Sequence, residues 1–141
     1  MPKRSASAEW RGGLKGGNGT MNVTRAKFEM PYTFPSRFEE GQGMSPEDLI
    51  AAAIAGCFSM AFSADLEKAG FVPESVRTTA TAILEPVNGA PTIHRIELDT
   101  TARVPNIDES TFQQQAQQAK ANCPVSRLYK GAEIRLTARL A

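Results

Sequence analysis

One stretch of the sequence, from Ser45 to Gly70, shows almost no alternation between apolar and polar positions. Between Leu49 and Phe62 the only polar side chain is Ser59. A helix on the surface of a globular protein would show a polar face in every two turns. The pattern therefore predicts a long core helix, apolar nearly all round, with Cys57 near its midpoint. The apolar run is too short to span a bilayer, and charged residues flank it closely.

Both ends of this helix carry termination signals. Ser45 is placed to accept hydrogen bonds from the first free backbone N–H groups, Pro46 suits the first helical position, and Asp48 completes a variant of the capping box. Gly70 can adopt the left-handed conformation that ends a helix. The helix is therefore predicted over about 24 residues, or about 36 Å.

Before the helix, the pattern indicates extended chain. Two short strands, residues 5–11 and 20–24, are predicted on either side of a glycine-rich turn at residues 12–19. Residues 28–43 contain Pro31 and Pro35 and are predicted to be irregular.

After the helix, two strands, a second helix and a last strand are predicted. Asn88-Gly89 is a turn pair between strands 76–84 and 93–104, and Asp108 caps a helix over residues 109–120. Asn122-Cys123-Pro124 breaks this helix and starts a short one that ends at Leu128; the last strand is predicted over residues 132–140. The sequence thus predicts a single α+β domain, residues 1–141, in which an N-terminal and a C-terminal antiparallel portion flank the long buried helix.

Composition narrows the possible functions. The chain of 141 residues has 16 basic and 15 acidic side chains and a net charge of +1, which gives no electrostatic reason to expect nucleic acid or a membrane surface as a partner. The first residues show no signal peptide, so a cytoplasmic location is expected. The only histidine, His94, and two distant cysteines are too few ligands for a metal site.

Four residues are candidates for chemistry: Cys57, Cys123, Arg37 and Glu47. A thiol becomes a good nucleophile when a cation or a helix N-terminus stabilises its thiolate. Cys57 is predicted at mid-helix and needs a cation, for which Arg37 is the best candidate, and Glu47 could hold Arg37 through a two-point ion pair. On residue chemistry alone, an inert core thiol stays the simpler interpretation of Cys57.

Helix geometry separates two of these residues. Glu47 and Cys57 are ten residues apart on one predicted helix, which places them about 15 Å apart along the axis and about 80° apart around it. In one subunit they cannot serve the same centre unless the helix breaks. Two such helices packed antiparallel across a two-fold axis would bring Glu47 of one chain near Cys57 of the other. A homodimer with two composite sites is therefore predicted.

Three segments of the chain carry a family resemblance. The helix segment 46–61, Arg37-Phe38-Glu39 before it and Ala121-Asn122-Cys123-Pro124-Val125-Ser126 after it resemble motifs of the OsmC/Ohr family. Trp10 with its glycine-rich hairpin, the segment 104–108 and the placement of Arg37 resemble the OsmC branch of that family. The resemblance covers nearly the whole chain.

This resemblance implies a thiol peroxidase that prefers organic hydroperoxides. Cys57 would be the peroxidatic cysteine and Cys123 the resolving one, joined by a disulfide during turnover. Arg37 would stabilise the Cys57 thiolate, and Glu47 would orient Arg37. The family implies a dihydrolipoamide-like dithiol reductant, an intertwined α+β homodimer, and no metal, haem or flavin cofactor.

Two alternatives stay open at this stage. The same scaffold could carry a thiol-disulfide oxidoreductase, which would exchange its disulfide without consuming hydroperoxide. It could also be a non-enzymatic dimer that binds a hydrophobic ligand or serves a structural role, with cysteines that only fill the core.

Overall fold

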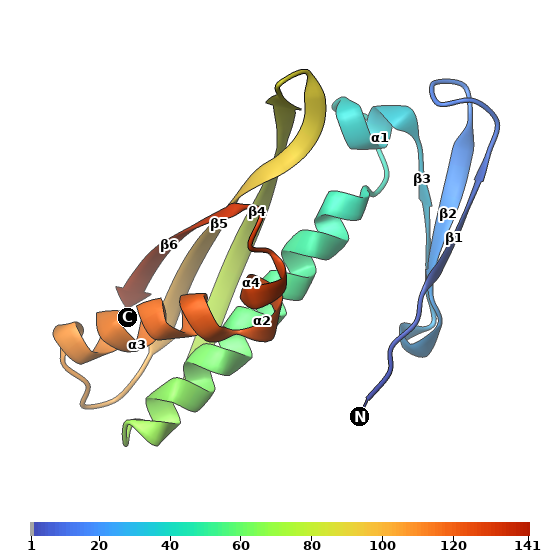
Figure 1. Cartoon of the computed structure of the whole chain (residues 1–141). Helices are drawn as coiled ribbons and strands as arrows, with labels where there is room; N and C mark the ends of the chain where they lie inside the picture. The colour runs from blue at the N-terminus through green and yellow to red at the C-terminus, as the bar shows by residue number, and fades with distance from the viewer. Residues whose placement is uncertain (1) are drawn as a thin grey trace. The chain divides into compact units, whose positions relative to one another are not determined.

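The computed structural model describes residues 2–141 of the chain (Figure 1). The chain divides into two compact units, Met1–Asp48 and Leu49–Ala141. The expectation of a single domain over residues 1–141 stays a prediction.

The first unit is a small antiparallel sheet followed by a short helix. Its strands pair in the order β1-β2-β3, and the glycine-rich turn joins β1 to β2 as predicted. A side chain at Gly19 would meet the rings of Trp10 and Tyr32 at 2.7 Å, so glycine is needed where these rings pack 5.3 Å apart. The elements are β1 (Ser7–Arg11), β2 (Asn18–Val23), η1 (Thr24–Ala26), β3 (Phe28–Tyr32) and α1 (Phe34–Phe38).

The prediction that residues 28–43 are irregular was wrong for most of this segment. The two prolines that suggested it lie where regular structure tolerates them. Pro31 is in β3, an edge strand of the sheet, and an edge strand can lack one donor. Pro35 is in the first turn of α1, where its missing N–H would be unpaired anyway. Thr33 caps α1 through a full capping box with Ser36.

Helix α2 runs unbroken over 23 residues, Pro46–Lys68. Its C-terminal signal works as predicted: Gly70 has φ +95°, and the N–H groups of Gly70 and Phe71 bond to the carbonyls of Glu67 and Leu66. These two bonds form a Schellman motif.

The N-terminus of α2 differs in detail from the prediction. The Asp48 carboxylate accepts from the Ser45 backbone N–H at 2.8 Å, which is the reverse half of a capping box. The Ser45 hydroxyl donates to the same carboxylate at 3.2 Å instead of accepting from a backbone N–H. The acidic side chain is the stronger acceptor for that hydroxyl.

Helix α2 is buried along one stripe and not all round, which corrects the prediction for this chain. The stripe consists of four fully buried side chains spaced four residues apart: Ile54, Phe58, Phe62 and Leu66. The opposite face is also apolar but exposed, and Met60 on it is 79% accessible. The other exposed residues of this face are Ala52, Ala53, Gly56 and Ala64.

By length and composition, α2 could also cross a membrane, with a mean hydropathy of 1.8 over its most apolar window. The core helix of a water-soluble protein passes the same test, and the buried stripe of α2 packs in the core of the second unit. The predicted cytoplasmic location stays a prediction.

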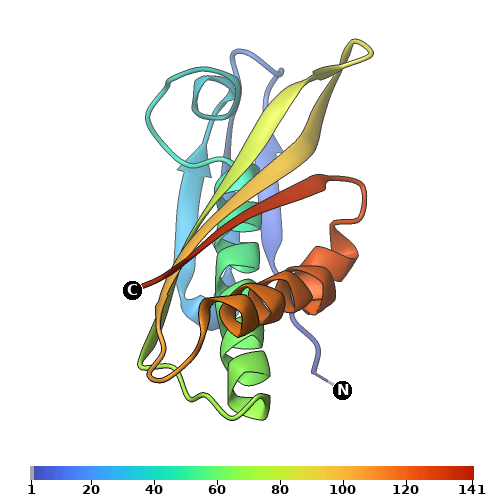
Figure 2. The same ribbon diagram turned by 90° about the vertical axis from the view of Figure 1, so that its left-hand side faces the viewer.

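The second unit contains a three-stranded sheet in the order β4-β5-β6 (Figure 2). The Asn88-Gly89 turn joins β4 to β5, and both of its residues have positive φ, 52° and 81°, as a type I′ hairpin turn requires. The elements after α2 are β4 (Ser75–Val87), β5 (Ala90–Arg103), α3 (Glu109–Asn122), α4 (Pro124–Leu128) and β6 (Glu133–Leu140).

The prediction of an antiparallel C-terminal portion was wrong for its last strand. Strands β4 and β5 are antiparallel, but β6 runs parallel to β5. A parallel pair needs a long crossover to carry the chain back to the same end of the sheet. Helices α3 and α4 form that crossover.

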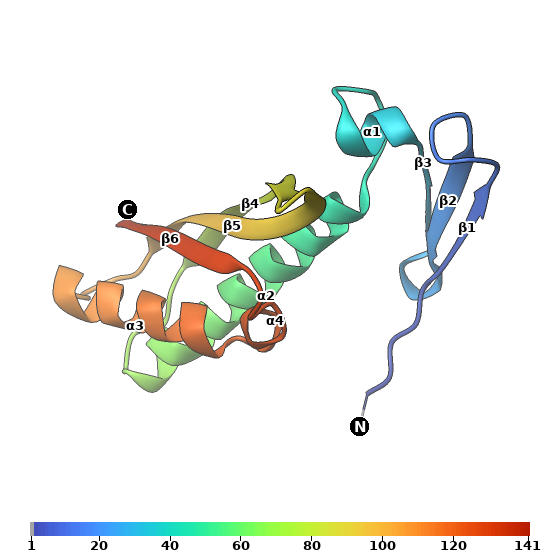
Figure 3. The ribbon, with the colours of Figure 1, turned by 45° about the horizontal axis from the view of Figure 1, so that its top comes forward.

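The core of the second unit lies between its sheet and its helices (Figure 3). The predicted inward face of β5 is buried, at Ile96, Leu98, Thr100 and Ala102. The predicted apolar stripe of α3, Phe112, Ala116 and Ala119, is fully buried on the same core, and Asp108 caps α3 through the Thr111 N–H. This core sets the place of the two cysteines.

Candidate active site

Cys57 lies on α2, beside the buried stripe, and is partly buried. Its sulfur accepts a hydrogen bond from the backbone N–H of Val125 at 3.5 Å. Val125 belongs to the first turn of α4, where backbone N–H groups have no partner within the helix. One of these free N–H groups therefore donates to the thiol in the middle of α2. The dipole of α2 itself gives Cys57 little help at mid-helix.

Cys123 is the N-cap of α4 and is 1% exposed. Its sulfur accepts from the backbone N–H of Ser126 at 3.4 Å and lies 2.9 Å from the Ser126 hydroxyl oxygen. Cysteine is a rare N-cap because sulfur is a weak acceptor. The sequence predicted that a helix starts at Pro124. In the structure the Cys123 sulfur accepts a hydrogen bond from one of the free amides at the start of that helix.

The two sulfurs thus accept from successive amides of one short helix, and both thiols are reduced. Burial raises the pKa of the Cys57 thiol, and the neighbouring Cys123 thiol raises it further, while the Val125 N–H opposes both effects. A hydrogen bond to sulfur favours the thiolate, whereas desolvation disfavours it. Within the second unit, then, Cys57 needs a further source of positive charge to be a thiolate at neutral pH.

Arg37 and Glu47 form an ion pair in the first unit. The guanidinium donates from Nε at 3.1 Å and from Nη2 at 2.9 Å, both to the same carboxylate oxygen, Oε1. The Glu47 side chain is only 9% exposed and that of Arg37 38%. The predicted two-point pair is present as two donors on one oxygen and not as a fork to two, and Oε2 of Glu47 is buried without a protein partner.

Arg37 also lines an aromatic hollow of about 190 Å³ within the first unit. Its guanidinium lies over the Phe38 ring at 5.2 Å. A guanidinium beside aromatic rings offers a polar group at the wall of an apolar pocket. The other lining residues are Trp10, Leu14, Tyr32, Thr33 and Phe34.

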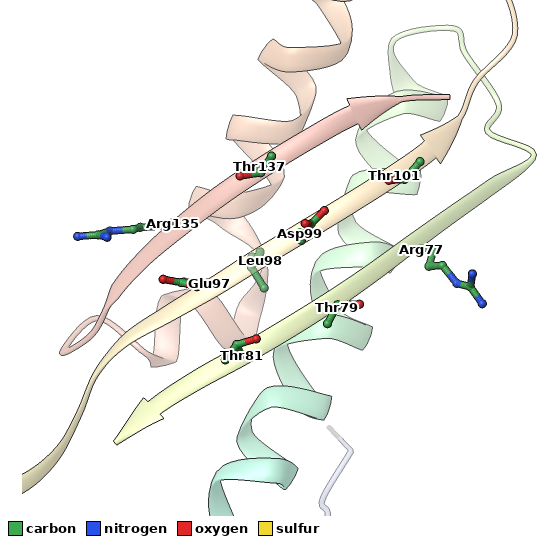
Figure 4. A pocket seen from close by; sticks show the side chains of 9 residues that line it. All are labelled: Arg77, Thr79, Thr81, Glu97, Leu98, Asp99, Thr101, Arg135 and Thr137. Carbon is green, nitrogen blue, oxygen red and sulfur yellow. The ribbon is translucent and has the colours of Figure 1, made fainter. Parts of the chain in front are cut away.

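A larger hollow, about 660 Å³, lies on the outer face of the second unit's sheet (Figure 4). It is lined by threonines and charged side chains from three strands, among them Arg77, Asp99 and Arg135. Neither cysteine lines it, because the core face of this sheet is the opposite one. We therefore assign the chemistry to the cysteines and not to this hollow.

The remaining polar residue singled out from the sequence is His94. It lies on β5 and pairs with Glu85 across the β4–β5 hairpin at 2.7 Å, as a surface strand residue would. Among residues 2–141, no group of three or more histidine, cysteine or acidic side chains could hold a metal ion.

Two functional groups escaped the sequence reasoning: the Val125 amide on Cys57 and the Ser126 hydroxyl on Cys123. The Cys-Pro pair, which starts a helix at Pro124, was the available signal for the amide. No signal in the sequence shows that α4 packs against the middle of α2.

Comparison with known proteins gives the family. Residues 39–138 match the OsmC-like protein family. Over 138 residues the chain is 45% identical to peroxiredoxin OsmC of Escherichia coli, covering 97% of this chain and 96% of that one. The chain belongs to the OsmC-like family, and at this identity it is an enzyme of the peroxidase class.

Solved structures agree on the fold. An OsmC-like protein from Mycoplasma pneumoniae matches with a TM-score of 0.74 at 15% identity, covering 99% and 98% of the two chains. An organic hydroperoxide resistance protein from Elizabethkingia anophelis matches with a TM-score of 0.73 at 22% identity, covering 99% of each chain. The α+β arrangement with a long helix is therefore that of the family.

Proposed function

We propose that this chain reduces organic hydroperoxides to alcohols through a sulfenic acid on Cys57 and a Cys57–Cys123 disulfide. The observation that carries the proposal is the pair of reduced thiols whose sulfurs accept from the successive amides of Val125 and Ser126. Two thiols held by the first turn of the same short helix, one from α2 and one at the N-cap of α4, suit a cycle that joins them.

The proposed cycle balances in three steps. The Cys57 thiolate attacks one peroxide oxygen; the O–O bond breaks, the alkoxide takes up a proton and leaves as the alcohol, and Cys57 is oxidised to sulfenic acid. The Cys123 thiolate then displaces hydroxide, which leaves as water, and forms the disulfide. A dithiol reductant of the dihydrolipoamide kind reopens it by thiol–disulfide exchange.

The preference for organic substrates rests on the surroundings of Arg37. The aromatic hollow beside it suits an apolar group, and the guanidinium suits the peroxide oxygens. A substrate bound in this way places its peroxide group next to the Arg37 guanidinium and buries its carbon skeleton in the aromatic hollow.

The charge that Cys57 needs comes, in this proposal, from Arg37. Burial raises the pKa of Cys57, and a guanidinium at the sulfur would lower it. Glu47 is the positioning residue, because its carboxylate fixes both the Nε and Nη2 donors of Arg37.

We infer that the functional unit is a homodimer in which each site takes Arg37 and Glu47 from one copy and both cysteines from the other. Two observations support this. Helix α2 is unbroken from Pro46 to Lys68, so Glu47 and Cys57 lie about 15 Å apart along its axis. The exposed face of α2 is apolar and made mostly of small residues, which lets two helices approach closely.

Complementation between variants tests the composite site. Chains carrying Cys57→Ser are expected to be inactive and chains carrying Arg37→Ala nearly so. Their mixed dimer has one intact site of two and is expected to regain about half of the wild-type activity per dimer. Sites built within one chain would leave the mixed dimer inactive. Light scattering on the wild type checks that a dimer exists.

The test of the function is turnover of cumene hydroperoxide with dithiothreitol. We expect multiple turnovers in the wild type and none in Cys57→Ser. Cys123→Ser reports whether the added dithiol can reduce the sulfenic acid directly. Facile Cys57–Cys123 exchange without peroxide consumption would instead favour a thiol-disulfide oxidoreductase, and inert thiols would favour a passive ligand-binding dimer.

A further inference from the structure

Ser126 carries a buried hydroxyl aimed at a sulfur. The residue is 6% exposed, and its Oγ lies 2.9 Å from the Sγ of Cys123. A serine hydroxyl in a helix commonly bonds back to a carbonyl of the preceding turn. Here it lies against a thiol, which is a weak hydrogen-bond partner. The contact therefore adds little to the stability of the fold.

The backbone of the same residue also serves that sulfur. The Ser126 N–H donates to the Cys123 Sγ at 3.4 Å. Either the hydroxyl or the neutral thiol can be the donor of the second contact, but a thiolate can only accept, and one residue then offers it two donors. Two donors favour the charged form of the group that accepts them. The thiolate is the form in which a cysteine attacks a sulfenic acid.

We propose that Ser126 is a positioning residue of the resolving step: its hydroxyl and its amide hold the Cys123 sulfur in place and stabilise it as a thiolate for attack on oxidised Cys57. This inference rests on the proposed function, because it presumes that Cys57 becomes a sulfenic acid. It assigns Ser126 no part in the attack on the peroxide.

The step itself needs no reagent beyond the two cysteines. The Cys123 thiolate attacks the Cys57 sulfur, the S–S bond forms and the S–O bond breaks. The hydroxide that leaves takes up the proton that Cys123 had lost, and water is released. The Ser126 hydroxyl keeps its own proton throughout and donates a hydrogen bond to the sulfur until the disulfide forms.

The hydrogen-bond donors to the two sulfurs, on Val125 and on Ser126, both belong to α4. The amide of Val125 faces Cys57 and the next residue faces Cys123, so a single helical turn fixes both sulfurs. A change at Ser126 that leaves the turn intact should therefore alter the second sulfur only.

The experiment separates the two steps in rapid-mixing assays with one equivalent of cumene hydroperoxide. A sulfenic acid trap times the oxidation of Cys57, and the loss of both thiols times the disulfide. In Ser126→Ala we expect disulfide formation to slow about tenfold, because one hydrogen bond to a charged group is lost. The rate of sulfenic acid formation should change less than twofold. Excess peroxide should then convert more Cys57 to sulfinic acid.

Two matched comparisons guard against a purely structural effect. Ser126→Thr and Ser126→Val have the same shape and differ only in the hydroxyl, so the Thr variant should form the disulfide faster than the Val variant by a similar factor. Ser59→Ala removes another partly buried hydroxyl of the second unit, the one that donates to Thr78 at 2.8 Å, and should leave the resolving step unchanged.

Disulfide formation at the wild-type rate in Ser126→Ala, or equal rates in the Thr and Val variants, would overturn the proposal and leave the peroxidase function standing. A slowing of both steps by the same factor would also overturn it, since that is the result of a general packing defect. Failure of the wild type to trap any sulfenic acid at Cys57 would instead overturn the proposed function itself.

Discussion

The two units of the chain divide the proposed chemistry between them. The unit Leu49–Ala141 holds both thiols on a well-packed core, with twelve buried residues in one cluster. The unit Met1–Asp48 holds the Arg37–Glu47 pair and the aromatic hollow, and Met21 is its one buried apolar residue among those described. Both thiols thus lie in the unit with the larger core, while the cation lies on helix α1 of a unit with little core of its own.

The electrostatics of the two units differ in the same sense. The second unit raises the pKa of Cys57 and supplies only a backbone amide against that rise. The first unit has a cation whose two donors are held by a buried carboxylate. Each unit lacks what the other has, and the proposed function requires both.

The largest effect should come from the core of the second unit. Phe62 is fully buried between the rings of Phe58 and Phe112, with centroids 5.6 and 5.3 Å away. Phe62→Ala is expected to cost about 3–5 kcal/mol of the free energy of unfolding. Met21→Ala, on the central strand β2 of the first unit's small sheet, is expected to cost about 2 kcal/mol. Urea unfolding of both variants checks the contrast, and equal losses would contradict it.

Next in size is the loss of the cation. Arg37→Ala is expected to lower kcat/KM for cumene hydroperoxide about 100-fold, because charged hydrogen bonds worth about 2–3 kcal/mol are lost. Because burial already raises the pKa of Cys57, the variant should need higher pH for sulfenic acid formation, and its rate should keep rising with pH where the wild type has levelled.

A pH–rate profile of the peroxide step measures this change. Arg37→Lys keeps the charge but not the planar fork, so the pH midpoint of its profile should lie between those of the wild type and Arg37→Ala. An Arg37→Ala profile with the wild-type midpoint would show that Arg37 does not act on the Cys57 thiolate.

Much of this fold followed from local patterns. The C-terminal cap of α2, the N-cap of α3, the Asn88-Gly89 turn and the alternation in β5 each depend on neighbouring residues, and each was predicted in place. The parallel pairing of β6 was missed because alternation along a strand carries no information about its direction relative to a distant partner. The regular structure at residues 28–38 was missed because Pro31 and Pro35 lie at the few positions that tolerate proline.

The site was predictable to a different degree. The roles of the four site residues stay predictions from chemistry and family resemblance, and the predicted Arg37–Glu47 pair is present. The contact of Val125 with Cys57 joins residues 68 positions apart, and no pattern in one sequence fixes the approach of such distant elements. The exposed apolar face of α2 was predicted to be buried, because the apolar pattern of a sequence does not show what, if anything, covers a face.

A smaller effect is expected from the positioning carboxylate. Glu47→Gln keeps the size of the side chain but removes the charge that fixes Arg37, so kcat/KM should fall about tenfold with little change in KM. Glu85→Gln is the control, since it removes the exposed carboxylate that pairs with His94 and should leave the activity unchanged. Equal activities in the two variants would remove Glu47 from the site.

The smallest effect concerns a helix cap far from the chemistry. The Asp108 carboxylate accepts from Thr111 at the start of α3, and this hydrogen bond lowers its pKa below the ordinary value. Its stabilisation is therefore present above the unfolded pKa and is lost as the pH falls through the folded one. Asp108→Ala should lower Tm slightly at pH 7 and not at pH 2, as thermal unfolding at the two pH values would show.

The most direct measurement of the central claim is thiol mapping after one equivalent of cumene hydroperoxide, without reductant. The account predicts one alcohol released per chain and a Cys57–Cys123 disulfide within each chain, identified by mass spectrometry of non-reduced peptides. Oxidation that stops at Cys57, or a disulfide between chains, would contradict it, because the two thiols whose sulfurs accept from the first turn of α4 would then not resolve one another.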